Sequence, residues 1–519
     1  MNKVNVIIPM AGHSRRFHQA GYVGPKALLS VGFKRMIEHV VDMFDTTLCH
    51  YHIVINSMQL SDDPDLIDYL AQLAVRVNVV VVENHELGPV YSVLQVDGIG
   101  DEEEVIISYC DFIVDWDYSY FMRHVSGEDG GIVSFRGFHP ASFGDTYYAY
   151  LNVDGDRMVE LREKRSFTQN RSQEHASAGI YYFKRFDTFK KYGQKWLNKE
   201  NKILPEAYVS LLYNDMVLDN LSVIVHEVGK FICLGTPDDY EQYQFWWKYF
   251  TEEPKSITQG NRDVTRIGLI PMAGMGSRFR EYGYRVAKPL IHVQGSPMVF
   301  KTVRSMPEQD RWIFLPRQED LTRHPIEKAL RSFSDHVIIH GVQEHTTGQA
   351  ATCMLVSDHI DDDAELIIAS ADYEHRYDSK LWREVLDDPT IDGAIWTYRS
   401  GSMMLKNPEM FAYCCVEEDG VTISKIVEKD TISETPNLDP LVVGTFWYRR
   451  GSDFKVAAKN MINRDITVNG EHYVGTSINY LIESGKKFVI FDIRQWISFG
   501  DPFELKVLEY WEEYFNGEY

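Results

Sequence analysis

The amino-acid sequence predicts an α/β fold that occurs twice in one chain. Short, continuous β-rich runs such as Val4–Pro9 alternate with helical patterns such as 35–44, whose apolar residues fall on one face. A continuous run of this kind is typical of a strand buried on both faces of a sheet, and alternation of strands with helices favours parallel pairing. The peptide "IPMAG" at Ile8–Gly12 returns at Ile270–Gly274, which indicates an internal repeat. We therefore expect two similar domains with mixed, mostly parallel sheets.

The repeat extends along the whole chain. Placing Pro9 on Pro271 gives an offset of 262 residues, and later matches keep their order at offsets of 261 to 265. They pair "EVIISYCD" with "ELIIASAD", "LREKR" with "IVEKD", "AGIYYF" with "VGTFWY" and "LGTPDDY" with "FGDPFEL". The polar segment between the copies contains Pro and Gly and lacks apolar periodicity. We predict an N-terminal domain over 1–250, a linker over 251–265 and a C-terminal domain over 266–519.

Composition narrows the class of protein. The chain has 519 residues and a formal net charge of −23 at pH 7, which argues against a nucleic-acid partner because phosphate backbones need a basic surface. No run of about 18 apolar residues is present, so no membrane-spanning helix is expected. The six cysteines lack metal-type spacing and fit a cytoplasmic location. Oligomeric state is left open, a homo-oligomer included.

The loop after the first strand of each copy is suited to phosphate. Glycine lets a backbone approach an anion closely, and in each copy an arginine and, ten residues on, a lysine follow: Arg16 and Lys26, then Arg278 and Lys288. The spacing matches neither a Walker A motif nor a dinucleotide fingerprint, because Phe279 stands where the third glycine of the latter belongs. Taken alone, the loop could equally be a tight structural turn.

Together with the other repeated motifs, "PMAGMGSRF…AKPL" resembles the sugar-nucleotidyltransferase (nucleotide-sugar pyrophosphorylase) family along each half. The resemblance implies two tandem Rossmann-like (GT-A-like) nucleotidyltransferase domains. It implies Mg²⁺-dependent transfer of a nucleotidyl group from a nucleoside triphosphate, a pyrimidine one, to a sugar-1-phosphate or related phosphate acceptor. Pyrophosphate would leave, and the product would serve polysaccharide or glycoconjugate synthesis.

The resemblance also implies roles for single residues. The catalytic cations are Arg278, Lys288, Arg16 and Lys26. The nucleotide-binding residues are Ala273, Gly274, Gly276, Ser277, Gln343 and Gly348, with Ala11, Gly12, Glu83 and Gly88 in the first copy. The acceptor-binding residues are Lys429, Glu428 and Gly444, with Lys164, Glu163 and Gly179 in the first copy. The metal ligands are Asp372 and Asp111.

Three departures from the family pattern leave the role of each copy open. Ser14 replaces Gly276 where the backbone is expected to need a positive φ, at a cost of about 1 kcal/mol. Glu83 replaces Gln343, and an ionised carboxylate accepts hydrogen bonds without donating any, so the copies could differ in base or the first could bind none. Cys233 and Ser498 stand where a second metal carboxylate is usual.

These departures keep several functions under consideration. Both copies could be active, only the C-terminal one could be catalytic beside a regulatory N-terminal one, or the chain could be a non-catalytic nucleotide-sugar sensor. A glycosyltransferase is a further alternative, since "DWD" at 115–117 has the form of a metal motif, but the second copy has no counterpart.

Overall fold

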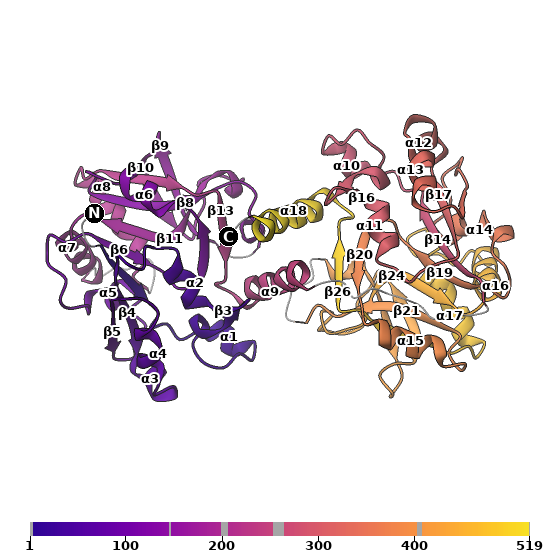
Figure 1. Cartoon of the computed structure of the whole chain (residues 1–519), viewed down its shortest axis with the longest axis horizontal. Coiled ribbons are helices and arrows are strands. Elements are labelled where there is room, and N and C mark those ends of the chain that lie inside the picture. Colours follow the sequence, from indigo (N-terminus) through magenta and orange to yellow (C-terminus); the bar gives the residue numbers. More distant parts are fainter. Residues whose placement is uncertain (1–3, 145–146, 199–205, 253–263, 402–406, 518–519) are drawn as a thin grey trace. The chain divides into compact units, whose positions relative to one another are not determined.

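The structure, a computed structural model, describes residues 4–144, 147–198, 206–252, 264–401 and 407–517. Most of the predicted linker, 253–263, lies outside these residues. The chain divides into two compact units, Met1–Trp247 (unit 1) and Lys248–Tyr519 (unit 2), and the boundary falls within helix α9 (Figure 1). Each unit is built around its own sheet.

The sheet of unit 1 has nine strands in the order β5-β4-β1-β6-β11-β8-β12-β10-β9. The four strands β5, β4, β1 and β6 run parallel, whereas β11 is antiparallel to both β6 and β8. The strands are β1 (Asn5–Pro9), β4 (His50–Asn56), β5 (Val77–Val82), β6 (Val105–Ser108), β8 (Gly130–Phe135), β9 (Ala149–Asp154), β10 (Arg157–Glu163), β11 (His175–Phe183) and β12 (Val223–Glu227). Separate two-stranded ribbons pair β7 (Phe112–Asp115) with β13 (Lys230–Cys233) and β2 (Ser30–Val31) with β3 (Lys34–Arg35).

Unit 2 repeats this topology. Its main path runs β18-β17-β14-β19-β24-β21-β25, with β14 parallel to β17 and β19, and β24 antiparallel to β19 and β21. The strands are β14 (Arg266–Met272), β17 (Arg311–Pro316), β18 (Val337–Ile339), β19 (Glu365–Ala369), β21 (Gly393–Tyr398), β22 (Ala412–Val416), β23 (Ile423–Glu428), β24 (Leu441–Tyr448) and β25 (Phe488–Asp492). Its ribbons pair β20 (Tyr373–Arg376) with β26 (Gln495–Ser498) and β15 (His292–Val293) with β16 (Ser296–Pro297). The predicted α/β class with mixed sheets is confirmed.

Helices cover both faces of each sheet. In unit 1, Tyr181 and Phe183 of β11 point into a core with α5 (Pro89–Leu94), α7 (Phe186–Leu197) and α8 (Leu212–Leu218). Tyr182, between them, meets Phe121 of α6 (Tyr118–His124) on the opposite face, where α2 (Met36–Asp42) also lies. The alternation follows from the two-residue period of a strand.

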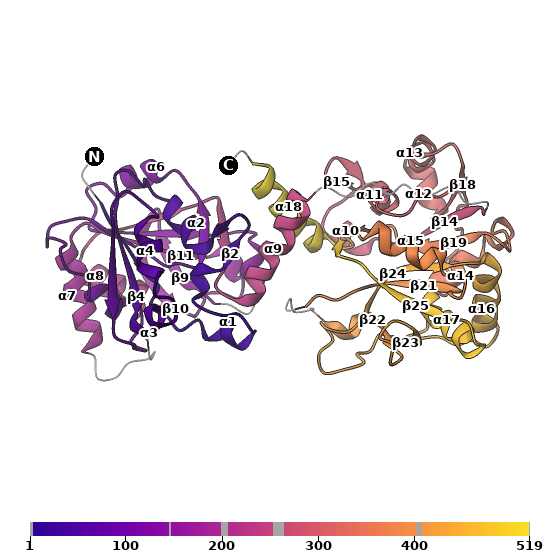
Figure 2. The same ribbon diagram turned by 60° about the horizontal axis from the view of Figure 1, so that its bottom comes forward.

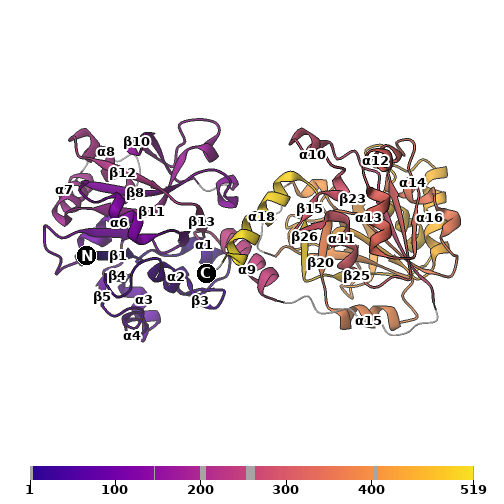
Figure 3. The same ribbon diagram turned by 45° about the horizontal axis from the view of Figure 1, so that its top comes forward.

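Unit 2 is layered in the same way. One face carries α14 (Gln349–Met354), α16 (Gly451–Asn463) and α17 (Val474–Glu483). These three helices lie side by side in Figure 2, and Figure 3 shows α14 next to α16. The other face carries α11 (Met298–Arg304), α13 (Ile326–Phe333) and α15 (Ser379–Asp387), with Trp382 packed on Trp447 of β24.

The remaining helices of the two units are α1 (Arg15–Gln19), α3 (Ser57–Asp62), α4 (Leu66–Ala71), α9 (Pro237–Thr251), α10 (Ser277–Glu281), α12 (Gln318–Arg323) and α18 (Pro502–Asn516). None of the helices in the described part of the chain is both long and apolar enough to cross a membrane.

The local predictions differ from the structure mainly at element ends. The segment 63–75, predicted as one helix, is helical only over Leu66–Ala71, because the chain turns at Gln72 to enter β5. The predicted strands at 52–57 and 77–83 and the two closing aromatic helices are confirmed as β4, β5, α9 and α18.

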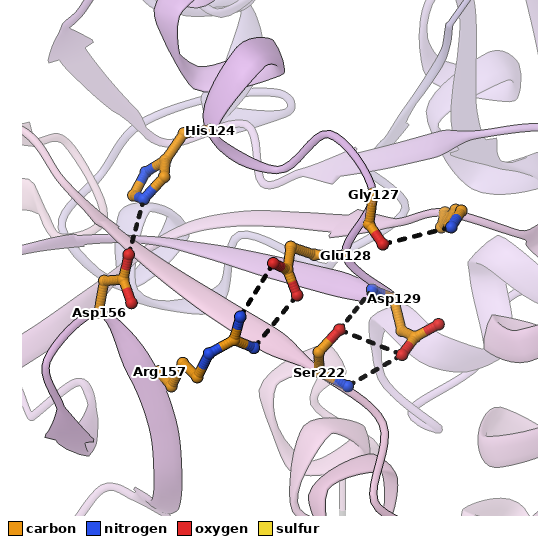
Figure 4. A network of polar contacts seen from close by, with 8 residues as sticks. His124, Gly127, Glu128, Asp129, Asp156, Arg157 and Ser222 are labelled. Carbon is orange, nitrogen blue, oxygen red and sulfur yellow. Dashed lines mark hydrogen bonds and ion pairs between the residues drawn. The ribbon is translucent and has the colours of Figure 1, made fainter.

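A polar network fixes the β9–β10 hairpin of unit 1 (Figure 4). Asp156 in the hairpin turn lies 3.2 Å from Nε2 of His124, and the guanidinium of Arg157 donates two hydrogen bonds to Glu128. The hydrogen bond from His124 lowers the pKa of Asp156. Hydrogen bonds from Ser222 and, to a smaller extent, from Arg157 lower the pKa of Glu128. The network holds the start of β10, the strand that ends at Glu163, directly before Lys164.

Candidate active site

Each unit has a loop of small residues where its first strand ends. Residue 14 in unit 1 has φ 50° and ψ 30°, and residue 276 in unit 2 has φ 60° and ψ 30°. The predicted need for a positive φ at this position is therefore confirmed, and glycine meets it without steric cost. Ser14 compensates in another way, since its hydroxyl accepts a hydrogen bond of 3.0 Å from the backbone N–H of Lys26.

Two buried side chains hold the carbonyl groups of the unit 1 loop. Asn56 donates to the carbonyl of Ala11 at 2.8 Å, and Gln59 donates to the carbonyl of Met10 at 2.9 Å. Asn56 and Gln59 also cap α3 reciprocally, so their positions are set by the turn from β4 into that helix. Neither residue was recognised from the sequence, because a capping box carries no sign of what its spare amide groups will bind.

A lysine–aspartate ion pair follows the loop in both units. Nζ of Lys26 lies 2.5 Å from Oδ2 of Asp111, and Nζ of Lys288 lies 2.6 Å from Oδ2 of Asp372. All four side chains are about three-quarters buried. Burial would lower the pKa of Lys26, but the Asp111 carboxylate and nearby thiols outweigh it and raise that pKa. The lysine therefore stays positively charged at neutral pH.

The ion pairs lie at the carboxyl ends of central parallel strands. Asp111 comes shortly after β6 and Asp372 shortly after β19, and the backbone carbonyl of each accepts an N–H from the segment beyond the ribbon, Leu234 or Phe499. Ligands of open α/β sheets bind in the crevice at this edge. The geometry thus places cation, carboxylate and glycine loop where a substrate would be expected.

In unit 1 these groups line one cavity of about 540 Å³. Seven of the predicted first-copy residues line it: Ala11, Gly12, Arg16, Lys26, Gly88, Asp111 and Lys164. Glu83, Glu163 and Gly179 do not, and Glu83 is exposed to solvent. The cavity also includes residues that sequence patterns did not single out for binding: His13, Arg15, His85, Glu86, Ser92, Tyr109, Glu206 and Tyr208.

The glycine predicted beside the base is sterically required in both units. A Cβ added to Gly88, whose φ is +87°, would lie 2.6 Å from the backbone nitrogen of Ala207. A Cβ on Gly348, whose φ is +128°, would lie 2.5 Å from the backbone nitrogen of His472. The two loops are thus packed against equivalent chain segments, which carry Tyr208 and Tyr473 one residue later.

The predicted acceptor residues also occupy equivalent positions. Lys164 and Lys429 both have positive φ values, 58° and 57°, and each Nζ donates to a backbone carbonyl, that of Tyr147 or Met410. Each ammonium also lies over a tyrosine ring, at 5.6 Å from Tyr208 in unit 1 and 5.7 Å from Tyr473 in unit 2. Tyr208 and Tyr473 match each other in the sequence at an offset of 265 residues, but only the fold brings each tyrosine to its lysine.

The glutamates before these lysines differ between the units. Burial raises the pKa of Glu163, and Ser210 partly offsets this by donating a hydrogen bond of 2.5 Å. At Glu428 burial raises the pKa to about 7. The residue at the place of Ser210 is Gly475, where an added Cβ would lie 2.3 Å from the Glu428 carboxylate. Glu428 is thus the more readily protonated carboxyl. Gly179 and Gly444 have positive φ values and leave space for Phe112 and Tyr373.

Other predicted unit 2 residues are more open. The side chain of Arg278 is 70% exposed, and its Nη1 lies 3.8 Å from Oδ2 of Asp501. Gln343 is exposed, and its Nε2 lies 3.5 Å from Oε1 of Gln318. Ser277 is the first residue of α10. Ala273 and Gly274 lie in the loop before that helix. A larger cavity of about 1530 Å³ in unit 2 is lined by Lys301, Arg304 and other residues, none of them in the predicted site.

Buried carboxyls stand beside the positions that lack a metal ligand. The thiol of Cys233 donates to Asp239 at 3.2 Å, and the hydroxyl of Ser498 donates to Glu504 at 2.7 Å. Burial raises the pKa of both acids. A Cβ on Gly500 would lie 3.1 Å from Oδ2 of Asp372 and 3.6 Å from Oε2 of Glu504, so these carboxyls face the same small space. No group of three or more metal-binding side chains occurs among the described residues.

Comparison with known proteins gives one family match. Residues 6–167 match the family model of the MobA-like NTP transferase domain. No curated protein sequence matches the chain.

Several solved structures are similar to about half of the chain. A nucleoside-diphosphate-sugar pyrophosphorylase from Vibrio cholerae RC9 is 20% identical, with a TM-score of 0.39, covering 46% of this chain and 98% of its own. An inositol-1-phosphate CTP transferase from T. maritima is 12% identical, with a TM-score of 0.38 and coverage of 49% and 98%. A UDP-glucose pyrophosphorylase from Acinetobacter baumanii is 18% identical, with a TM-score of 0.38 and coverage of 49% and 95%. From the family match, residues 6–167 of unit 1 are similar to MobA-like NTP transferase domains.

Proposed function

We propose that this chain is a nucleotidyltransferase that transfers a nucleotidyl group from a nucleoside triphosphate to a phosphorylated acceptor, a sugar-1-phosphate being the leading candidate. The observation that carries the proposal is the repeated lysine–aspartate pair at the carboxyl edge of each sheet, beside a loop with a positive-φ residue, Ser14 or Gly276. The family match of residues 6–167 supports the same reaction class for unit 1. Both units would bind a triphosphate.

In this reaction an oxygen of the acceptor phosphate attacks the α-phosphorus, and the bond from that phosphorus to the bridging oxygen of pyrophosphate breaks. Such transfer depends mostly on positioning and neutralisation of charge. The loop N–H groups and Arg16 or Arg278 would hold the triphosphate, and Lys26 or Lys288 would exchange its aspartate partner for a phosphate oxygen. Lys164 or Lys429 would hold the acceptor phosphate.

Asp111 and Asp372 would hold Mg²⁺, which neutralises phosphate charge when bound. Mg²⁺ sites commonly use one or two carboxylates and take their other ligands from substrate phosphates and water. An aspartate at the carboxyl edge of the sheet with a second carboxyl close by, as at Asp372 and Glu504, fits that donor set. Burial raises the pKa of the Glu504 carboxyl, which disfavours the ionised form that a metal ion needs. We further propose a cytoplasmic enzyme, in keeping with six cysteines that form no disulfide.

The test is pyrophosphate release from each common nucleoside triphosphate with a panel of sugar-1-phosphates and other phosphate acceptors, with Mg²⁺. The full chain is compared with Arg16→Ala and Arg278→Ala. Loss of different activities in the two variants establishes two catalytic units. Loss in Arg278→Ala alone makes unit 1 a binding or regulatory domain.

Exposed arginines outside the site serve as matched controls: Arg123→Ala in α6 and Arg331→Ala in α13. Both should retain the activity of the parent chain. If no pair of triphosphate and acceptor releases pyrophosphate, the catalytic proposal is overturned. Binding of a triphosphate without turnover would then favour the alternative of a non-catalytic nucleotide-sugar sensor.

A further inference from the structure

A tyrosine that follows a central strand of unit 1 is replaced by a serine in unit 2. Tyr109 comes directly after β6 and, at an offset of 261 residues, corresponds to Ser370 after β19. Both side chains lie against the same glycine of the fold. A Cβ added to Gly179 would lie 3.4 Å from Cδ2 of Tyr109, and a Cβ added to Gly444 would lie 3.5 Å from Oγ of Ser370. Unit 1 therefore has an aromatic ring where unit 2 has a short hydroxyl side chain.

Tyr109 lies on the side of the unit 1 cavity that is assigned to the acceptor. It lines the cavity together with Lys164 and Tyr208, and it is only partly buried. The backbone N–H of Val209, the residue after Tyr208, donates to its hydroxyl at 3.3 Å. The ammonium of Lys164 lies 5.6 Å from the centre of the Tyr208 ring and 3.9 Å from Oε1 of Glu163. An acceptor whose phosphate is held by Lys164 would therefore meet Tyr109.

Neighbouring side chains fix the orientation of the Tyr109 ring. It meets the ring of Tyr181 edge to face, with the ring centres 5.6 Å apart, and the hydroxyl of Tyr181 accepts a hydrogen bond of 3.0 Å from Ser177. Unit 2 has Phe446 in place of Tyr181 and Val442 in place of Ser177. The tyrosine and the polar groups that support it are thus replaced together in unit 2. Because both its ring and its hydroxyl have partners, Tyr109 forms a fixed side of the unit 1 cavity.

A tyrosine close to Ser370 does not take the place of the Tyr109 ring in unit 2. Tyr373 corresponds to Phe112 of unit 1, and its hydroxyl accepts the backbone N–H of Ser370 at 3.0 Å. Tyr373 is buried, and a Cβ on Gly444 would lie 2.5 Å from its hydroxyl. Its hydroxyl therefore supports the backbone after β19, while the partly exposed residue at this place is Ser370.

We propose that Tyr109 and Ser370 set the size of the acceptor that each unit takes, so that unit 1 selects a compact phosphorylated acceptor and unit 2 admits one with a bulky substituent. This inference rests on the proposed function and assigns a different acceptor class to each unit. A fixed ring excludes a larger substrate by steric overlap, because a packed site has little spare volume. A single methylene group in a pocket changes the selectivity of an enzyme by about 10–200-fold.

Pyrophosphate release with acceptors of increasing size tests the proposal: glycerol 3-phosphate, a hexose-1-phosphate and the matching N-acetylhexosamine-1-phosphate. Unit 1 is measured in the full chain with Lys288→Ala, and unit 2 in the full chain with Lys26→Ala. We expect Tyr109→Ser to raise kcat/KM for the largest acceptor, relative to the smaller ones, about tenfold in unit 1. Ser370→Tyr should lower the same ratio by a similar factor in unit 2. The KM for the triphosphate should stay unchanged in both.

Three further chains separate the size of the ring from other effects of the substitutions. Tyr109→Phe keeps the ring and removes the hydroxyl, so it should retain the acceptor ratio of the parent chain. Tyr120→Ser in α6 and Ser424→Tyr in β23 make the same exchanges at exposed positions and should leave the ratio unchanged. If Tyr109→Phe shifts the ratio as Tyr109→Ser does, the ring is not the determinant and the inference is overturned.

The remaining outcomes distinguish this inference from the proposed function. If pyrophosphate is released but neither Tyr109→Ser nor Ser370→Tyr shifts the acceptor ratio, the role of these residues is overturned and the nucleotidyltransferase stands. If only one unit is active, or if Tyr109→Ser fails to fold, the exchange in the other unit or in the active one decides. If no acceptor gives pyrophosphate in either unit, both proposals fail.

Discussion

The loops that follow β1 and β14 reach the same backbone conformation with different residues. Ser14 and Gly276 both lie in the left-handed region, but only the serine has a Cβ to accommodate there. The serine hydroxyl accepts the N–H of Lys26, whereas a Cβ at 276 would crowd the Cβ of Lys288 at 3.2 Å. Replacement of the glycine by Ser14 therefore does not by itself indicate that the unit 1 loop has lost its conformation, because a local hydrogen bond can offset the strain.

The same comparison applies to the charged groups. The lysine–aspartate distances, 2.5 and 2.6 Å, agree between the units, while three other positions have diverged: His13 corresponds to Met275, Ser210 to Gly475 and Cys233 to Ser498. Both units thus retain the ion pair to which the proposed function assigns the triphosphate.

The largest expected effect follows from removal of the paired lysine. Lys26→Met and Lys288→Met should each lower nucleotidyl transfer by their own unit about 10²–10³-fold, because a preorganised cation near the reacting phosphate is lost. Pyrophosphate release measures the effect, with the exposed Lys34→Met and Lys425→Met as controls. Full activity in a chain that carries both site substitutions would contradict the comparison.

The next effect concerns the glycines before α5 and α14. Gly88→Ala and Gly348→Ala should each destabilise their unit by about 3 kcal/mol or more, because the new Cβ meets backbone atoms within 2.6 Å at a positive φ. Urea unfolding, read by hydrogen exchange within each unit, measures the loss. Gly229→Ala and Gly274→Ala are matched controls, since no heavy atom lies within 4 Å of their added Cβ atoms. Equal stability of Gly88→Ala and Gly229→Ala would show that the close packing is not rigid.

Acidification should lower the stability of unit 1 more than that of unit 2, and this effect is smaller than that of the glycine substitutions. Burial lowers the pKa of His52, His139 and His226 in unit 1 to about 4, whereas in unit 2 burial raises the pKa of Glu428 to about 7. Between about pH 6.5 and 4 the unfolded state of unit 1 binds more protons at these histidines than the folded state does, so that unit loses stability. Between pH 7 and 4.5 folded Glu428 binds the extra proton and adds stability to unit 2, opposing the loss from buried His375.

Hydrogen exchange of the β1 and β14 amides at pH 7 and pH 5, corrected for intrinsic rates, measures this difference. Unit 1 should lose more protection than unit 2. Glu428→Gln removes the carboxyl that titrates in unit 2, and with it that unit's gain on acidification. Parallel loss of protection in the two units, before and after this substitution, would refute the assignment.

The smallest effect is expected for exchange of the loop residues themselves. Ser14→Gly should change the stability of unit 1 by less than about 1 kcal/mol, because relief of the left-handed strain and loss of the Lys26 hydrogen bond oppose each other. Gly276→Ser should cost unit 2 about 1 kcal/mol, less if the new hydroxyl reaches the N–H of Lys288. Thermal unfolding of the exchanged pair measures both, and a loss above about 2 kcal/mol in Ser14→Gly would mean that the hydrogen bond dominates.

The sequence by itself determined the elements whose signal is local. Continuous apolar runs predicted β1, β4 and β5, and the repeat predicted that Lys26 and Asp111 should recur as Lys288 and Asp372. These inferences succeed because strand period, glycine conformation and motif spacing depend on neighbouring residues. The positive φ at residue 14 was predictable for the same reason, since the second copy retains a glycine there.

Only the tertiary structure decided which of those residues meet. It brings Lys164 and Tyr208 into the cavity of Lys26 and leaves Glu83 outside it. It also directs Asn56 and Gln59 to the loop carbonyls, although both read as an ordinary helix cap. Contacts of this kind join residues from 44 to more than 130 positions apart in the sequence, and their geometry depends on the order of the strands in the sheet rather than on any local pattern.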